Sequence, residues 1–135
     1  MIELKEIKKS DHLFLYELLS ERDPKENISH TIMPTFKQHV KFVMSKPYKK
    51  WYIIYFKNEK CGSIYLSKMN EIGIHFKRNS QSSKLYQDCI DTLISKNYND
   101  RFLMNINPKN KMLIKFAKNH HFKLIQYTYE LALHK

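Results

Sequence analysis

The feature that most constrains the fold of this chain is a run of strand-like segments in its middle, joined by short turns. Residues 51–56 (WYIIYF) are β-branched or aromatic, as is typical of a buried strand. The pair Asn58-Glu59 predicts a tight turn, and residues 61–66 then return as the partner strand of a hairpin. A further turn leads into residues 71–77, a third strand. We therefore expect an antiparallel meander at the centre of the protein.

Two helices are predicted before this meander. Ser10 or Asp11 can cap the first helix, and residues 22–34, which are polar and contain two prolines, predict a loop after it. A second helix opens at residues 34–35 and ends before Pro47, because the residue before a proline disfavours helical geometry. The apolar positions that indicate an opening strand and the first helix are Ile2, Leu4, Ile7, Leu13, Leu15, Leu18 and Leu19.

Strands and helices alternate in the C-terminal half. A polar segment, residues 78–84, leads into a helix, and residues 101–106 and 122–133 predict strands on either side of a helix over residues 110–119. Strand–helix–strand units favour parallel pairing. The predicted order is β-α-α-β-β-β-α-β-α-β, an α/β fold with a mixed sheet and helices on both faces, in one domain over residues 1–135. The side chains expected to face inward from the helix after residue 84 are Leu85, Cys89, Leu93 and Ile94.

Composition argues against several classes of function. The net charge of +11 rests on lysine, since only three of the 24 basic residues are arginine, the residue that reads bases most often, so nucleic acid is not an expected partner. The longest apolar run is far shorter than the roughly 20 residues that span a bilayer, and no signal-peptide pattern opens the chain, so a cytoplasmic protein is expected. Cys61 and Cys89 are expected to be reduced and packed as small hydrophobes. His120-His121 has no suitably spaced carboxylate or cysteine, so no metal site is predicted.

The order of the elements, with a polar loop between a strand and its following helix, resembles the GNAT superfamily of acyl-CoA N-acyltransferases over essentially the whole chain. The resemblance implies a GNAT-like fold with acetyl-CoA as co-substrate. The segments that carry it are residues 71–74 (EIGI), 105–110 (NINPKN) and 122–125 (FKLI), and, as in a bacterial subset of the family, residues 21–24 (ERDP), 27–30 (NISH), 33–34 (MP), 47–48 (PY) and 51–52 (WY).

The resemblance also implies where the cofactor binds. In such enzymes the pantetheine arm pairs with the backbone of the fourth strand, here residues 72–77. The pyrophosphate lies on backbone N–H groups at the start of the next helix, where unpaired donors and the helix dipole favour anions. The implied cofactor-binding residues are Ile72, Ile74, His75, Phe76, Gln81, Ser82, Ser83, Lys84, Leu85, Tyr86 and Asn110.

The cofactor loop departs from the family pattern. Gln81 matches, but Lys84 and Tyr86 stand where the family has glycine. Either the Lys84 ammonium supports the phosphates and weakened binding is retained, or Tyr86 fills the phosphate position and binding is lost. Ala117 stands where many members carry a tyrosine that protonates the departing thiolate, and His121 stands at a family glycine.

The candidate catalytic residues each have a structural alternative. Glu71 begins the fourth strand, where the family often places a carboxylate that acts through water, yet a solvated strand-end glutamate is equally compatible with the sequence. His30 lies in the predicted loop between the first two helices, which in such enzymes walls the acceptor site, and it could be a base or an acid there or merely an exposed side chain. Asn105 could bond the pantetheine or acetyl group, or belong to a bulge, and Asn110 most simply caps the last helix. The aromatic residues Tyr48, Trp51 and Tyr52 are expected in the core instead of forming a stacking platform.

Two functions follow from this sequence. The first is an acetyl-CoA-dependent N-acetyltransferase that acts on a primary amine of a small molecule, with an amino sugar as one candidate. The alternative is a non-catalytic GNAT-like module that has lost the cofactor and serves in protein interaction.

Overall fold

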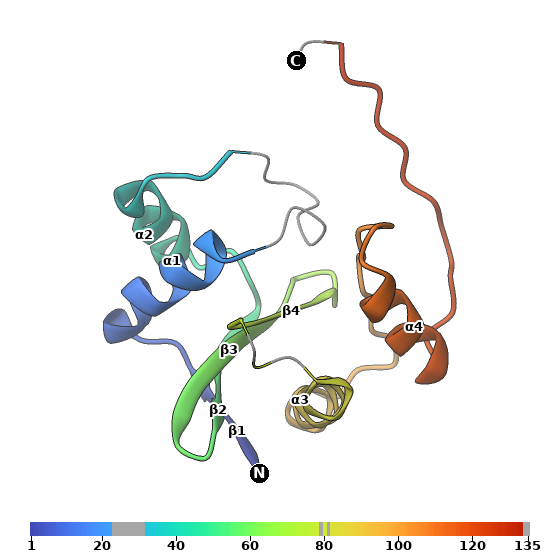
Figure 1. Cartoon of the computed structure of the whole chain (residues 1–135), viewed down its shortest axis with the longest axis horizontal. Helices are drawn as coiled ribbons and strands as arrows, with labels where there is room; N and C mark the ends of the chain where they lie inside the picture. Colours follow the sequence, from blue (N-terminus) through green and yellow to red (C-terminus); the bar gives the residue numbers. More distant parts are fainter. Residues whose placement is uncertain (23–31, 79, 81, 134–135) are drawn as a thin grey trace.

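The computed structural model describes residues 1–22, 32–78, 80 and 82–133, and a four-stranded antiparallel sheet forms its centre (Figure 1). The hairpin between the second and third strands turns at Lys57 and Asn58, both with positive φ, the pattern of a two-residue type I′ turn. The predicted meander is confirmed, with its turn one residue earlier than expected. The strands, in sheet order, are β1 (Ile2–Glu6), β2 (Lys50–Phe56), β3 (Glu59–Leu66) and β4 (Ile72–Phe76).

Helices cover both faces of the sheet, as Figure 1 shows. Alternate side chains of β2 separate the two faces, because successive residues of a strand point to opposite sides. Ile53, with Trp51 and Tyr55, packs on the first two helices, whereas Tyr52 and Ile54 join the core beneath the last two. The helices are α1 (His12–Ser20) and α2 (Phe36–Met44) on the first face, and α3 (Ser83–Lys96) and α4 (Lys111–Asn119) on the other.

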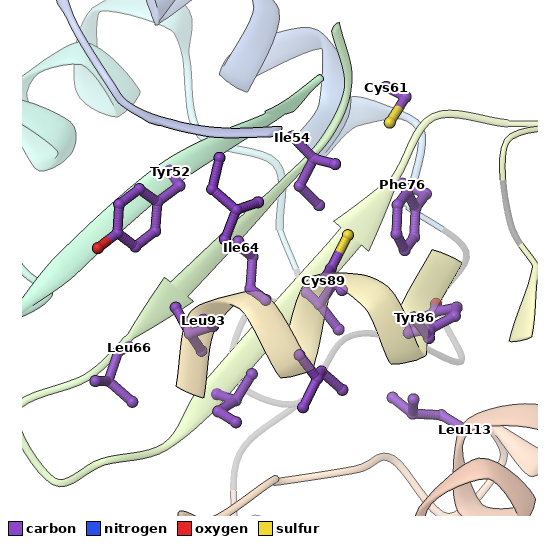
Figure 2. Close-up of a cluster of buried hydrophobic side chains, with 14 of the residues drawn as sticks. Tyr52, Ile54, Cys61, Ile64, Leu66, Phe76, Tyr86, Cys89, Leu93 and Leu113 are labelled. Atoms are coloured by element: carbon purple, nitrogen blue, oxygen red, sulfur yellow. The ribbon is translucent and has the colours of Figure 1, made fainter. Parts of the chain in front are cut away.

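The larger core lies between the sheet and α3, with α4 at its margin (Figure 2). The predicted inward face of α3 is confirmed, because Cys89 and Leu93 are buried and Leu85 and Ile94 pack, partly buried, against the core. Tyr86 and Ile90 are buried beside them and make this face wider than expected. Cys61 and Cys89 are free and buried, as expected. Burial raises the pKa of the Cys89 thiol to about 12, so this thiol stays protonated and unreactive at neutral pH.

A partly buried ion pair fixes the start of α1 to the sheet. A short 3₁₀ turn, η1 (Lys9–Asp11), precedes the helix, and the Asp11 side chain is only 1% exposed. Its carboxylate accepts hydrogen bonds from the Lys60 ammonium at 2.7 Å and from the Lys8 backbone N–H at 2.9 Å. Both oxygens are therefore satisfied, which is what a buried charge requires.

The two C-terminal strands differ from the prediction. Residues 101–106 pair with the sheet only through a parallel bridge between Glu71 and Leu103. This bridge adds a fifth, parallel member to the four antiparallel strands, so the sheet is mixed. Residues 122–133 form no strand in the described structure, and they run away from the body of the molecule (Figure 1). A strand needs a neighbour for its backbone groups, and this segment meets none among the described residues. The fold class is confirmed, but the last predicted strand is not formed.

Candidate functional site

The outer edge of β4 presents backbone groups that the sheet does not use. Ser67 N–H donates to the Glu71 carbonyl at 2.9 Å, and Lys77 N–H donates to the Cys61 carbonyl at 2.8 Å. In an antiparallel ladder, bonded and non-bonded residues alternate, so odd-numbered residues of β4 bond to β3. Even-numbered residues therefore turn their N–H and C=O groups toward the opposite edge.

Only the first of these edge residues meets a partner strand. Ile72 N–H donates to the Leu103 carbonyl at 2.7 Å, and Leu103 N–H donates to the Asn70 carbonyl at 2.9 Å. Among the residues that the structure describes, Ile74 and Phe76 have no backbone partner on this edge. Pairing between β4 and residues 101–106 thus ends after one bridge and leaves a length of free strand edge.

Two of the four predicted strand residues offer backbone groups here. Ile74 and Phe76 face the free edge, while Ile72 N–H already binds Leu103 and the backbone of His75 belongs to the ladder with β3. The direction of backbone groups alternates along a strand, so a chain added at this edge can bond only every second residue of β4. The side chains of Ile72, Ile74 and Phe76 are buried beneath α3, so these residues have only backbone groups to offer a ligand.

The N-terminus of α3 follows closely on this edge. The Ser82 hydroxyl caps the helix by accepting from Leu85 N–H at 3.1 Å, and Tyr86 N–H donates to the Ser82 carbonyl at 3.1 Å. For the first-turn amides of Ser83 and Lys84, no partner occurs within the described parts of the chain. Open amides at the positive end of a helix dipole make this a favourable place for an anion. Gln81, also predicted here, lies outside the described residues.

Lys84 and Tyr86, which replace the family's glycines, have different environments. The Lys84 ammonium is 84% exposed and lies 3.4 Å from the Asp88 carboxylate, a weak surface pair that leaves it available to a ligand. Tyr86 is 1% exposed, and its ring lies edge-on to that of Phe76, with the centroids 4.9 Å apart (Figure 2). The centroid of the Phe116 ring lies 5.7 Å from that of Tyr86. Tyr86 is thus a core residue of α3.

The candidate catalytic residues Glu71 and Asn105 lie in direct contact. One oxygen of the Glu71 carboxylate accepts from the Asn105 amide at 2.6 Å, and the other accepts from the Ser67 hydroxyl at 3.0 Å. Ser67 in turn accepts from the Glu71 backbone N–H at 3.0 Å. The carboxylate therefore joins the turn before β4 to residues 101–106, at the point where the two backbones part.

Sequence reasoning missed Ser67. Its signal was the spacing Ser67-x-x-x-Glu71 across a predicted turn, since a hydroxyl at the start of a turn commonly bonds groups a few residues on. Asn70, at φ 63°, closes that turn by donating its N–H to the Ser67 carbonyl at 3.0 Å.

The other predicted site residues have the following places. Asn110 caps α4 by accepting from Leu113 N–H at 3.2 Å, which confirms its simplest interpretation. Ala117 is half-buried on α4 and has no group that could protonate a thiolate. His30 lies outside the described residues.

An aromatic cluster covers the opposite face of β4. The Tyr65 ring lies over Gly73, at the position that a Cβ on residue 73 would occupy, and Tyr48 stacks on Tyr65 with centroids 3.7 Å apart. Burial, with the neighbouring Tyr65, raises the pKa of Tyr48, so its hydroxyl remains neutral at physiological pH. The Trp51 indole N–H donates to the buried Ser63 hydroxyl at 2.7 Å. These contacts agree with the expectation that Tyr48, Trp51 and the buried Tyr52 are packing residues.

Two kinds of feature are absent from the described residues. No three His, Cys, Asp or Glu side chains gather there as a metal site would require. Likewise, no helix within those residues combines the length and apolar character needed to cross a membrane.

No protein-family model and no curated protein sequence matches this chain. Solved structures do match it. A domain from Methanocaldococcus jannaschii is 19% identical, with a TM-score of 0.77 over 96% of this chain and 93% of that one. RimL, a ribosomal L7/L12 α-N-protein acetyltransferase in complex with coenzyme A, is 18% identical, with a TM-score of 0.72 over 93% of this chain and 81% of RimL. PseH, an N-acetyltransferase from Campylobacter jejuni in complex with acetyl coenzyme A, is 15% identical, with a TM-score of 0.71 over 95% of this chain and 92% of PseH.

At these identities, what the matches share with this chain is the arrangement of the backbone. The matched lengths take in nearly all of this chain and most of each neighbour. The protein therefore has the fold of the GNAT-superfamily N-acetyltransferases.

Proposed function

We propose that this protein is an N-acetyltransferase that transfers an acetyl group from acetyl-CoA to a primary amine of a small molecule. The observation that carries the proposal is the free edge of β4 at Ile74 and Phe76, which leads into the open amides at the start of α3. An extended chain of amides and an anion are the two chemistries that such a surface accepts. Acetyl-CoA joins both in one molecule, and it supplies the activated acyl thioester for the reaction.

The residues present fit this co-substrate. The edge groups of Ile74 and Phe76 are suited to bond the amides of a pantetheine arm, as a neighbouring strand would. Ser83 and Lys84 offer two backbone N–H groups to a pyrophosphate, and the exposed Lys84 ammonium adds a charge that a glycine lacks. The position of Tyr86 supports retained cofactor binding. Its ring packs in the core against Phe76 and Phe116, so it does not fill the position proposed for the pyrophosphate.

Glu71 is proposed as the group that removes a proton from the attacking amine, through a water molecule. An ammonium must lose a proton before its nitrogen can attack a carbonyl, and a positioned carboxylate can receive that proton. Asn105 and the Ser67 hydroxyl hold the carboxylate in place at 2.6 and 3.0 Å. Asn105 and His30 remain proposed contributors, His30 as a base or acid from the loop between α1 and α2.

An amino sugar is the first acceptor to test. A small acceptor is our proposal for this chain; the matched RimL is described as acting on a ribosomal protein. A panel that includes amino sugars, polyamines and a peptide with a free N-terminus would therefore separate the acceptor classes.

A second candidate is a non-catalytic module that keeps the fold without the cofactor. Lys84 in place of a glycine and Ala117 in place of a tyrosine favour it. This candidate requires that acetyl-CoA leave the protein unaffected at any attainable concentration, whereas the enzyme requires binding.

Turnover with a matched pair of variants tests the proposal. Acetylated product would be measured by mass spectrometry with acetyl-CoA and the acceptor panel. Glu71→Gln is expected to lower kcat by roughly 10²–10⁴-fold, the usual contribution of a general base. Glu59→Gln, an exposed change on β3, is the control and should leave kcat unchanged. If Glu71→Gln lowers stability but retains full turnover, the carboxylate is only a structural link and its catalytic role is wrong.

A further inference from the structure

Residues 122–133, which we call the C-terminal segment, carry a dense run of exposed large apolar side chains. After α4 the segment is extended and runs away from the sheet (Figure 1). Tyr129 is 87% exposed and Leu131 is 85% exposed. Single exposed apolar residues are normal on a protein surface, but a contiguous run of them marks an interaction site. The large apolar side chains left in solvent are Leu124, Ile125, Tyr127, Tyr129, Leu131 and Leu133.

The segment has the pattern of a strand with one buried face. From residue 125 onward, odd positions are large and apolar, and even positions are Gln126, Thr128, Glu130 and Ala132. The rings of Tyr127 and Tyr129 lie 6.2 Å apart at 30°, as side chains two residues apart on one face of an extended chain do. The segment is therefore extended and has the amphipathic pattern of a strand, and among the described residues it has no neighbouring strand.

The exit from α4 directs this segment away from its own sheet. His120 caps the helix, His121 has a positive φ of 71°, and Phe122 N–H donates to the Ala117 carbonyl at 3.0 Å. This turn closes the helix within two residues. The chain then leaves with every described residue from 123 to 133 exposed, so it does not return to its own body.

The body of the molecule has an open strand position that matches this donor. Leu103 turns both its N–H and its C=O toward β4, so the backbone groups of its neighbours Phe102 and Met104 face the opposite side. For those groups the described chain offers no partner. The side chains of Phe102, Met104 and Ile106 pack against the main core and give this edge an apolar flank.

We propose that the C-terminal segment is a strand donated to a second copy of this chain, where it adds beside residues 101–106, and that the two copies exchange segments reciprocally. A second copy is the occupant because the described part of each chain carries both the donor segment and the acceptor edge, so reciprocal exchange closes with two-fold symmetry and pairs both acceptor edges. The tyrosines at 127 and 129 of both copies alone would remove roughly 600–1,000 Å² from solvent. With Ile125, Leu131 and Leu133, the contact exceeds the about 1,000 Å² that a stable interface needs.

This assembly is independent of acetyl-CoA and of turnover, so its test can fail without affecting the proposed function. The full chain would be examined by light scattering after size exclusion and by sedimentation over a wide concentration range. The expected species has twice the 16.4 kDa mass of one chain. A monomer at every concentration, whether its segment folds back or stays free, would overturn the proposal.

Two double variants with the same added charge identify the face that makes the contact. Tyr127→Lys with Tyr129→Lys changes the apolar face, and is expected to raise the dimer dissociation constant by at least roughly a hundredfold. Gln126→Lys with Thr128→Lys changes the polar face and should leave the dimer intact. Equal dissociation by both pairs would show that charge and not strand insertion is responsible, which contradicts the proposal.

Hydrogen exchange on the full chain locates the contact. In the dimer, amides of residues 123–133 and those of Phe102 and Met104 should be protected together, and both should lose protection in the Tyr127→Lys, Tyr129→Lys variant. A dimer in which the C-terminal segment exchanges freely would place the interface elsewhere and refute the strand exchange.

Discussion

Replacing Tyr86 with alanine tests most sharply whether this residue belongs to the core or to the cofactor loop. The ring is 1% exposed and makes aromatic contacts with Phe76 at 4.9 Å and Phe116 at 5.7 Å. Removing a buried aromatic ring costs about 3–5 kcal/mol through lost transfer energy and the cavity that remains. We therefore expect Tyr86→Ala to lower the free energy of unfolding by about 4 kcal/mol.

Urea unfolding followed by circular dichroism would measure this loss. Tyr98→Ala is the matched control, because Tyr98 is 79% exposed, and it should change the free energy of unfolding by less than about 0.5 kcal/mol. Since a typical domain is stable by only about 5–15 kcal/mol, Tyr86→Leu, which retains an apolar side chain, serves where the alanine variant is too unstable for binding experiments.

Acetyl-CoA affinity provides the second readout on the same variants. A ring engaged in the core should leave affinity unchanged when Tyr86 becomes leucine. Unchanged stability together with tighter acetyl-CoA binding would refute this reasoning, because it would mean that the ring occupies the phosphate position. Restoring glycine at residue 86 would remove a core ring, so the loop itself is better tested at Lys84 alone.

Three further substitutions test the local structure by urea or thermal unfolding. Asp11→Ala removes the partner of the Lys60 ammonium and should cost about 2–3 kcal/mol, so a change below about 0.5 kcal/mol would mean that the pair contributes little. His121→Gly relieves the left-handed backbone at the end of α4 and should raise Tm by about 2–4 °C, whereas an unchanged or lower Tm would show that this turn is unstrained. Gly73→Ala places a methyl group where the Tyr65 ring lies and should cost about 1–3 kcal/mol, and full stability would show that the ring moves aside freely.

Patterns of apolar residues predicted most of the fold, because most of its elements pair with their sequence neighbours. Residues 51–77 form a meander through tight turns, so their periodicity also determined their partners. The same kind of pattern predicted a strand over residues 122–133, where the structure has none. Alternation shows that a segment can form a strand but does not say which strand it joins, and here the described part of the chain provides no neighbour.

The site was predicted in part for a related reason. Glu71 and Asn105 are 34 positions apart in the sequence, and their contact follows from the bridge at Leu103, which no local pattern reports. Tyr86 was assigned to the loop by alignment with a glycine motif, although its spacing of three from Cys89 and seven from Leu93 indicates the buried face of a helix. Helical periodicity was the better guide at that residue.

Binding of acetyl-CoA is the measurement that tests the central claim most directly. A ligand that binds only the native state raises stability by RT ln(1 + [L]/Kd), about 2.7 kcal/mol at a hundred times Kd. Thermal unfolding of the full chain with increasing acetyl-CoA should therefore show a Tm that rises with concentration and saturates as this relation requires. If millimolar acetyl-CoA leaves the Tm unchanged, the edge of β4 and the start of α3 do not form an acyl-CoA site, and the proposed acetyltransferase activity is wrong.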